Sequence, residues 1–284
     1  MIRIGLSGWT YPGWRGVFYP DGLVHRRELE YASRRFSSLE VNGTHYSLQK
    51  PETFRRWKRE TPRDFVFSIK GSRYITHVRR LKEVGEALAN FFGSGMLGLR
   101  EKLGPFLWQL PPSLRFHPET LETFLALLPQ TTREAGRLIR RASRRTSSLA
   151  GVNPERSLRH SLEVRHESFL TPEFLGLLRK YRVAFVFADT AGKWPYAEDL
   201  TADFVYIRLH GSRKLYESGY GPEPLRRWAK RIRRWSEGGQ PRDARLVTPR
   251  RLAERTPRDV FVYFDNDAKV KAPANALTLR RILN

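Results

Sequence analysis

The sequence has no cysteine, two methionines and few amides, with six asparagines and four glutamines among 284 residues. The absence of cysteine excludes disulfides, thiolate nucleophiles and cysteine-ligated zinc or iron–sulfur centres. Such a composition suits a reducing compartment, and we expect a cytoplasmic protein. The apolar runs, such as 183–188, are too short to span a bilayer. A strand-like run directly after Met1 leaves no room for a signal peptide, so we expect no membrane association.

Acidic residues are scarce relative to basic ones, with 29 Asp and Glu against 52 Lys and Arg and a net charge of +23. An excess of this size attracts nucleic acid and other polyanions. It can also follow from genome composition, because 41 of the basic residues are arginine. Charged surfaces with few thermolabile residues are typical of heat-adapted proteins as well, although ion-pair networks need balanced signs. The charge alone leaves polyanion binding and a compositional origin both open.

Short β-type runs alternate with amphipathic, helix-like segments along the whole chain. The predicted strands are 2–6, 38–42, 65–70, 106–109, 162–165, 184–189, 205–210 and 260–265. The predicted helices are 51–60, 81–99, 118–128, 172–181, 222–235 and 273–283, several of which begin with proline. Eight such units in fewer than 300 residues predict an α/β fold, a single (β/α)₈ TIM-type barrel. No linker divides the chain, so we expect one domain over 1–284.

Two arginine-rich stretches, at about 130–160 and 237–258, lengthen the connections before the fifth and eighth strands. Connections that follow a helix and precede a strand emerge at the N-terminal face of a barrel, away from the mouth. In the first insertion Ala135, Leu138, Ile139 and Ala142 recur at helical spacing. This predicts an amphipathic helix with an arginine face. That face is either solvated surface or a docking site for nucleic acid that is independent of base sequence.

Polar residues appear at the C-terminal ends of strands that are otherwise apolar. Glu40 and Asn42, Glu163 and Arg165, and Arg208 and His210 are spaced two residues apart, so each pair faces one side of its strand. Burying unpaired charges against the outer helices would be costly, so these pairs should point into the mouth of the barrel. Barrel enzymes place their active sites at this end. The alternative is a structural plug of mutually satisfied ion pairs.

The candidate residues fall into two groups. The catalytic candidates are Glu163, Glu40, Lys70, Asp189 and His210. The substrate-binding candidates are Trp9, Asn42, Gln109, Arg165, His166, Arg208, Arg213 and Asn266. We expect Arg165 and Arg208 to hold Glu163 ionised as a base or metal ligand, and Lys70 to stabilise a developing negative charge. Further polar groups near strand ends are His77, Asp265 and Asp267.

Carboxylates with histidine could bind a divalent metal, although no HxH, HxxxH or HExxH spacing occurs. No Walker loop or GxGxxG motif is present, so we expect no nucleotide cofactor. The aromatic residues of the first strand–helix loop, between Trp9 and Tyr19, could stack on a base or sugar or could form a hydrophobic lid. In the seventh such loop, Arg213 and Lys214 are candidate phosphate ligands.

Seven short motifs, which include the strand-end residues above, resemble in sequence and order those of the YecE-like family, also known as domain of unknown function seventy-two. They are GLSGWTYPGW at 5–14, LEVNGTHY at 39–46, FSIK at 67–70, WQLPP at 108–112, EVRH at 163–166, RLHG at 208–211 and YFDND at 263–267. The resemblance implies a TIM-type barrel with this polar mouth and does not specify a reaction. His45 stands where the family usually has an aromatic residue, and Asp265 where it usually has asparagine.

Three functions are compatible with these observations. The leading hypothesis is an enzyme that acts on a phosphate- or sugar-containing substrate, including nucleic acid, by acid–base or metal-assisted hydrolysis. The second is a small-molecule isomerase or lyase of the carbohydrate type whose basicity is incidental. The third is a non-catalytic nucleic-acid-binding protein. The first two place their substrate in the barrel mouth.

Overall fold

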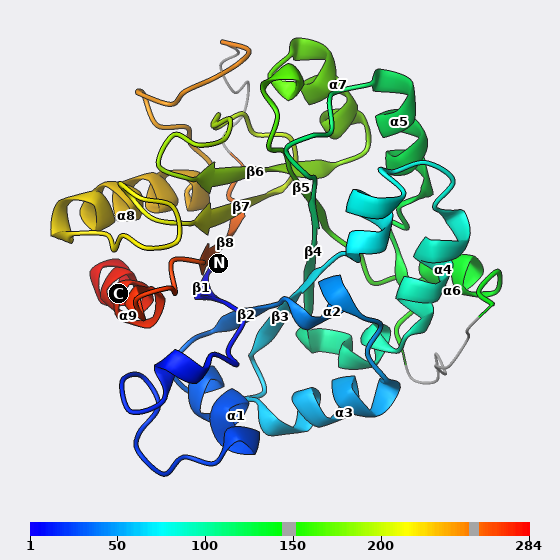
Figure 1. The fold of residues 1–284 in the computed structure, drawn as a ribbon. Coiled ribbons are helices and arrows are strands. Elements are labelled where there is room, and N and C mark those ends of the chain that lie inside the picture. Colours follow the sequence, from blue (N-terminus) through cyan, green and yellow to red (C-terminus); the bar gives the residue numbers. More distant parts are fainter. Residues whose placement is uncertain (144–151, 250–255) are drawn as a thin grey trace.

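The fold is a closed barrel of eight parallel strands, which follow one another around the ring in sequence order (Figure 1). It is seen in a computed structural model that describes residues 1–143, 152–249 and 256–284. The strands are β1 (Ile2–Ser7), β2 (Ser38–Val41), β3 (Val66–Lys70), β4 (Leu103–Gln109), β5 (His160–Glu163), β6 (Val183–Asp189), β7 (Phe204–Leu209) and β8 (Asp259–Phe264). The predicted TIM-type barrel is therefore confirmed, and each strand lies within about three residues of its predicted position.

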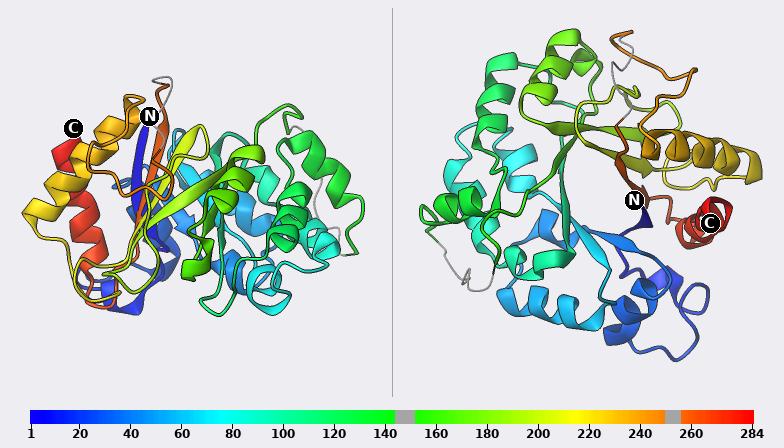
Figure 2. Two further views of the ribbon diagram at one scale, coloured as in Figure 1. Left: turned by 90° about the horizontal axis from the view of Figure 1, so that it is seen from above. Right: turned by 180° about the vertical axis from the view of Figure 1, so that it is seen from behind.

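Helices surround the strands on the outside, as the further views in Figure 2 show. The longer ones are α3 (Pro51–Glu60), α4 (Gly85–Gly93), α5 (Pro118–Leu127), α6 (Thr132–Ile139), α7 (Pro172–Lys180), α8 (Pro222–Ser236) and α9 (Lys271–Leu283). The single helix predicted over 81–99 is wrong: α4 ends at Gly93, and a separate 3₁₀ segment, Met96–Lys102, follows Gly95. Gly95 has a φ of 116°, a left-handed conformation that ends a helix. The short helices α1 (Glu28–Ser33) and α2 (Gly43–Tyr46) were not predicted.

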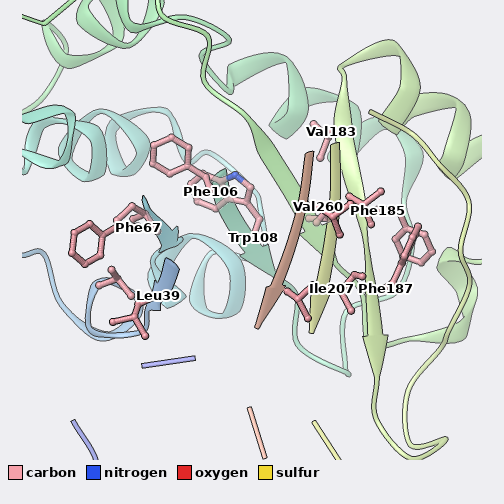
Figure 3. Close-up of a cluster of buried hydrophobic side chains, with 14 of the residues drawn as sticks. Leu39, Phe67, Phe106, Trp108, Val183, Phe185, Phe187, Ile207 and Val260 are labelled. Atoms are coloured by element: carbon pink, nitrogen blue, oxygen red, sulfur yellow. The ribbon is translucent and has the colours of Figure 1, made fainter. Parts of the chain in front are cut away.

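The main hydrophobic core lies between the strands and the helices (Figure 3). It is formed by alternate strand residues that point outward, such as Phe67 on β3, Trp108 on β4 and Phe185 on β6. The residues between them point into the barrel. Leu107, Ala184 and Tyr206 belong to this second, smaller cluster. The alternation decides which polar residues can reach the mouth.

The first arginine-rich insertion contains the predicted amphipathic helix, α6, whose Ala135 and Ile139 are buried. Its later arginines lie at the N-terminal ends of the strands. Arg156 donates to the carbonyl of Leu103 at the start of β4, and Arg159 pairs with Asp259 at the start of β8. The described part of the insertion that leads into β5 therefore lies on the face opposite the mouth. Arg144 and Arg145, which were also assigned to this insertion, lie outside the described residues.

The second insertion, in its described part before residue 250, packs against the segment that joins β6 to β7. The backbone amides of Val247 and Thr248 donate to Asp199, and Arg231 of α8 pairs with Glu198 at 2.6 Å.

The described residues contain no helix long and apolar enough to cross a bilayer.

Candidate active site

Inside the barrel, serine and tyrosine hydroxyls form a layer below the mouth. Tyr206 of β7 bonds to Ser68 of β3, and Tyr263 of β8 bonds to Ser38 of β2, each at 2.7 Å. Tyr206 is also within hydrogen-bond distance, 2.7 Å, of Glu40 Oε2. These contacts are possible because the side chains at positions 38, 40, 68, 206 and 263 all point inward, as strand alternation requires. The layer closes the barrel beneath the charged residues.

Above this layer, one guanidinium binds three carboxylates. Arg208 contacts both oxygens of Glu40, with Nη2 at 2.8 Å from Oε1 and Nε at 3.0 Å from Oε2. Its Nη1 donates to Glu163 Oε2 at 2.7 Å, and its Nη2 reaches Asp265 Oδ2 at 3.0 Å. The hydroxyl of Ser7 accepts a further hydrogen bond from Nη2 at 2.9 Å. We call Arg208, Glu40, Glu163, Asp265 and Ser7 the ion cluster.

Three members of the ion cluster, Glu163, Asp265 and Arg208, are charged at neutral pH. Burial opposes ionisation of Glu163 and Asp265, but the positive charge of Arg208 outweighs it and holds the pKa of both carboxyls well below the usual range. The three carboxylates in turn raise the pKa of Arg208 well above its ordinary value, against the effect of burial. The structure thus contains the polar plug that was the alternative to a functional site. The plug forms the floor of a pocket.

His210 extends the ion cluster towards solvent but stays buried. Its Nδ1 lies 3.0 Å from Asp265 Oδ2, and its Nε2 lies 3.3 Å from Nη1 of Arg208. The rings of Trp194 and Tyr216 pack edge-on against its imidazole. These contacts fix the orientation of His210 beneath the pocket.

A polar pocket of about 510 Å³ opens above the ion cluster at the C-terminal ends of the strands. Its walls come from strand ends and from the loops after them. It is lined by Tyr11, Asn42, His45, Tyr46, Lys70, Arg73, His77, Gln109, Arg165, Tyr216, Asp265, Asp267 and Ala268. The structure therefore brings Asn42, Lys70, Gln109 and Arg165 to the pocket wall, as the sequence predicts. Glu40, Glu163, Arg208 and His210 lie directly beneath.

Two groups on the pocket wall have pKa values closer to 7 than is usual for their residue types. Burial, with the charge of Arg208 adding to it, lowers the pKa of Lys70 to about 8. Burial, with the charge of Asp265 adding to it, raises the pKa of Asp267 to about 6. Burial also lowers the pKa of His45 to about 3 and that of His77 to about 4, so both imidazoles are neutral. Lys70 and Asp267 are thus the groups most easily charged or discharged here.

Arg165 is held rigidly at one side of the pocket. Its Nε donates to Glu163 Oε1 at 2.8 Å, and its guanidinium carbon lies 3.7 Å from the centre of the Trp194 ring. Both oxygens of Glu163 are therefore bound by guanidinium groups. A carboxylate in this state is a poor proton acceptor, which does not favour the role of base that the sequence suggested for Glu163.

Two predicted site residues point away from the mouth. Trp9 packs edge-on against Trp57 of α3, at 5.2 Å between ring centres, on the outside of the barrel. The strand ends at Ser7, and Gly8 has a φ of 90°, so the inward–outward alternation stops before Trp9. Asp189 faces outward because its neighbours Ala184, Val186 and Ala188 on β6 face inward. It accepts a hydrogen bond from Tyr220 at 3.1 Å.

Three more candidates lie outside the pocket lining. His166 Nδ1 bonds to Ser168 and caps the 3₁₀ turn after β5. Arg213 is exposed on the loop after β7. Asn266 is buried and donates to the carbonyl of Ser218 and to Asn275 of α9, which ties the end of β8 to neighbouring segments. Their contacts indicate structural roles for His166 and Asn266.

Several lining residues were not assigned to the site from the sequence: Tyr11, His45, Tyr46, Arg73 and Tyr216. All of them lie in loops or short helices after strands, where no strand periodicity indicates which way a side chain points. Tyr11 is the one member of the first-loop aromatic group that lines the pocket. Trp14 and Tyr19 are buried against each other and Phe18, so that group is mainly a hydrophobic cover.

The donor set of the mouth does not match a metal centre. Among the described residues, no three histidine, aspartate or glutamate side chains are placed to bind one ion. The three carboxylates that meet at the mouth, Glu40, Glu163 and Asp265, are all bound to Arg208. Because these carboxylate oxygens already accept hydrogen bonds from guanidinium groups, few of their lone pairs remain to bind a cation. The residues present fit an anionic ligand better than a divalent metal.

A family model described as "Protein of unknown function DUF72" matches residues 3–284. The UPF0759 protein YecE of Escherichia coli (strain K12) is 34% identical over 132 residues, which are 45% of this chain and 45% of that protein. The UPF0759 protein YunF of Bacillus subtilis (strain 168) is 28% identical over 117 residues, or 39% of this chain and 40% of that protein. The matched part spans less than half the length of both relatives.

Solved structures of the same family share the fold. A DUF72 family protein of Thermotoga maritima superposes with a TM-score of 0.76 at 25% identity, covering 100% of this chain and 99% of that one. A DUF72 family protein of Enterococcus faecalis gives a TM-score of 0.72 at 17% identity, with 100% and 96% coverage, and supports the fold alone.

Proposed function

The chain belongs to the DUF72 family, and from its own pocket we propose that it is an enzyme that acts on a small anionic substrate by acid–base chemistry. The substrate carries a phosphate or carboxylate group, as sugar phosphates and sugar acids do. The observation that carries this proposal is a pair of cations, Lys70 and Arg73, on the wall of one pocket. Neither has an acidic partner within 4.0 Å among the described residues.

The size of the pocket supports a small substrate. About 510 Å³ is within the range of sites that enclose small molecules. The buried ion cluster closes the pocket from below, so a substrate enters from the loop side only. Asn42 adds a group that a hydroxyl can satisfy, because its Oδ1 is buried and has no hydrogen-bond partner among the described residues. These features suit a compact, hydroxylated anion.

Lys70 and Asp267 supply the acid–base pair. Their pKa values, about 8 and about 6, lie on either side of neutrality, which allows one group to donate a proton and the other to accept one. Glu163 and Asp265 stay ionised and act as fixed negative charges that keep Arg208 in place. Such a pair serves hydrolysis, by protonating a leaving group, and also isomerisation or cleavage beside a carbonyl.

The test is whether the pocket prefers anions. The melting temperature of the protein is measured with sugar phosphates and sugar acids and with the matching neutral sugars. We expect stabilisation by the anionic members only, since ligand binding to the native state raises stability. Lys70→Met and Arg73→Gln should reduce it, whereas Arg226→Gln on the outer helix α8 should not. Equal stabilisation by neutral sugars, or none by any anion, would contradict the proposal.

Nucleic-acid binding is a second candidate function, and α8 favours it. Its apolar face, including Trp228 and Ile232, is buried, and its outer face carries a row of cations: Arg226, Arg227, Lys230, Arg233 and Arg234. They line a surface groove of about 1140 Å³ together with Arg242 of the second insertion. Two of these cations, Arg227 and Lys230, make no hydrogen bond or ion pair within the described residues. Three arginines of the first insertion, Arg133, Arg156 and Arg159, are engaged with Glu155, carbonyl oxygens and Asp259. We therefore propose α8, rather than the first insertion, as the docking surface.

A further inference from the structure

Two lysines in the described part of the chain are almost fully buried, and they differ in their partners. Lys102 Nζ donates to the carbonyls of Lys58 and Thr61, both at 2.7 Å, and to Thr61 Oγ1 at 3.0 Å. It uses all three hydrogens of its ammonium group, as a structural lysine does. Lys70 is 8% exposed, and its Nζ makes no hydrogen bond or ion pair within the part of the chain that the structure describes. A buried amine without acceptors is costly for stability alone.

We propose that Lys70 is a nucleophile whose Nζ forms an imine with the carbonyl carbon of an anionic aldehyde, ketone or 2-oxo acid. This inference rests on the proposed function, and it narrows the substrate class to carbonyl compounds that carry a phosphate or carboxylate group. The geometry supports it. Lys70 is the last residue of β3, points into the barrel and lines the pocket. Arg73, three residues later, and Arg165 line the same pocket and are placed to hold the anionic group.

The surroundings of Lys70 favour the neutral amine that a nucleophile needs. Burial and the charge of Arg208 bring its pKa to about 8, so much more of it is unprotonated near neutral pH than of an ordinary lysine. The charged groups that act on it are Arg208, Glu40, Asp265 and Glu163. His45 and His77 also line the pocket and are neutral. The three carboxylates oppose the shift, but each of them is also bound to Arg208.

The step balances without any further reactant. The Nζ lone pair forms a bond to the carbonyl carbon, the carbonyl oxygen takes up a proton, and Nζ gives up one. A second proton then converts the hydroxyl of this adduct to water, which leaves as the nitrogen lone pair forms the C=N bond. Asp267, on the wall of the same pocket and partly protonated near neutral pH, can supply that proton. The products are a protonated imine and one water molecule.

Reductive trapping tests the proposal on the intact protein. The chain is incubated with sodium cyanoborohydride and one of four probes: dihydroxyacetone phosphate, dihydroxyacetone, pyruvate or lactate. Mass spectrometry of the whole chain counts the adducts, and peptide mapping places them. We expect the phosphate probe, the carboxylate probe or both to label Lys70 in a saturable manner. Lactate has no carbonyl and should give no adduct.

Control variants separate specific from general lysine chemistry. Lys70→Met should remove the saturable adduct, whereas Lys180→Met, which changes an exposed lysine at the end of α7, should keep it. Arg73→Gln should raise the probe concentration needed for half-labelling at least several-fold while the adduct stays on Lys70. Circular dichroism and the melting temperature show whether each variant is folded.

The outcomes distinguish the two proposals. Saturable labelling of Lys70 by a charged probe, with dihydroxyacetone much slower, supports both. Labelling of Lys70 at the same rate by dihydroxyacetone supports the nucleophile and contradicts the anion site. Stabilisation of the protein by the charged probes without any adduct on Lys70 overturns the nucleophile and leaves the anion site intact. Neither stabilisation nor labelling overturns both.

Discussion

Arg208 Nη1 lies 2.7 Å from Glu163 Oε2, and the two side chains are 0% and 1% exposed. The same guanidinium binds Glu40 and Asp265, so a single cation from β7 compensates carboxylates from β2, β5 and the end of β8. Charges this deeply buried are tolerated only while they remain paired and hydrogen-bonded. The floor of the pocket therefore depends on Arg208 more than on any one of its acidic partners.

Replacing Arg208 with methionine should destabilise the protein strongly. The change leaves three buried carboxylates without their shared cation, and breaking a buried ion pair in this way costs about 3–5 kcal/mol. Urea unfolding measures the loss. Arg165→Met is the matched control. Arg165 is at the pocket wall, and when it is replaced Glu163 still has its ion pair with Arg208. A loss no greater than that of the control would show that the ion cluster is not needed for folding.

Replacing Lys70 with methionine should stabilise the protein at neutral pH. Its pKa falls from 10.5 to about 8 on folding, a difference worth on the order of 3 kcal/mol against the folded state. The charged form is disfavoured in the folded state, so this cost is fully present below pH 8 and disappears as the pH rises to 10.5. The stability gain of Lys70→Met should follow the same course. Denaturant unfolding at pH 7 and at pH 10 measures it.

Lys102→Met provides the contrast. Lys102 satisfies three acceptors, so its removal leaves two carbonyls and a hydroxyl unpaired and should destabilise the protein. If Lys70→Met also destabilised the protein, Lys70 would have a structural partner, and its burial would not lower the free energy of unfolding.

Strand alternation explains how much of the site was predictable. Glu40, Glu163 and Arg208 each belong to a pair of polar residues spaced two apart. Both faces of a barrel strand are buried, and a charge that faces the outer helices costs far more free energy than one that faces the polar mouth. The fold follows from the same alternation of short strands and amphipathic helices. Asp189 had no such partner on its strand, and it faces outward. The inward Ala184 and Ala188 on β6 were a usable signal, because small residues fit the crowded barrel interior.

The remaining site residues depend on loop conformation. The left-handed Gly8 turns Trp9 out of the mouth and leaves Tyr11 on the pocket wall. Arg73 and His77 are placed by the helical turn Tyr74–Val78 after β3. Local sequence does not determine where such side chains point, since the direction is set by packing between loops that are distant in the chain. The charge of α8 was visible in the sequence, whereas the pairing of Arg156 and Arg159 required the structure.

The affinity of the pocket for an anion should fall with rising pH in two steps. Sulfate is a suitable probe, because its charge is constant over pH 5–9. Ionisation of Asp267 near pH 6 adds a negative charge to the wall, and loss of the Lys70 proton near pH 8 removes a positive one. Both changes weaken anion binding. Isothermal titration calorimetry across the range measures it.

Two variants assign the lower step. Asp267→Asn should remove it, and a step that persists in this variant would belong to another group of the mouth. Asp265→Asn should move the step to lower pH, because the charge of Asp265 contributes to the raised pKa of Asp267. An unchanged step in Asp265→Asn would mean that burial alone sets this pKa.

Nucleic-acid binding, if α8 provides it, should depend on salt and on three particular cations. Arg226, Arg227 and Lys230 are exposed on the outer face of α8 and line its groove. Each phosphate contact contributes about 0.9 to the slope of log affinity against log salt for duplex DNA. Changing all three residues to glutamine should lower that slope by about 2–3, and the loss should be the same for any base sequence. Fluorescence anisotropy with labelled duplexes over a salt series measures it.

The matched control removes the same number of charges from the first insertion, with Arg137, Arg140 and Arg141 all changed to glutamine. These residues are also exposed, so the net charge of the two triple variants is equal and only the position differs. A flattened slope in the control alone would place the docking surface on the face opposite the mouth. Equal, small effects in both variants would mean that the whole charge of +23 acts as a diffuse field. Absence of binding at about 50 mM salt, where such contacts are strong, would leave that charge without a role in nucleic-acid binding.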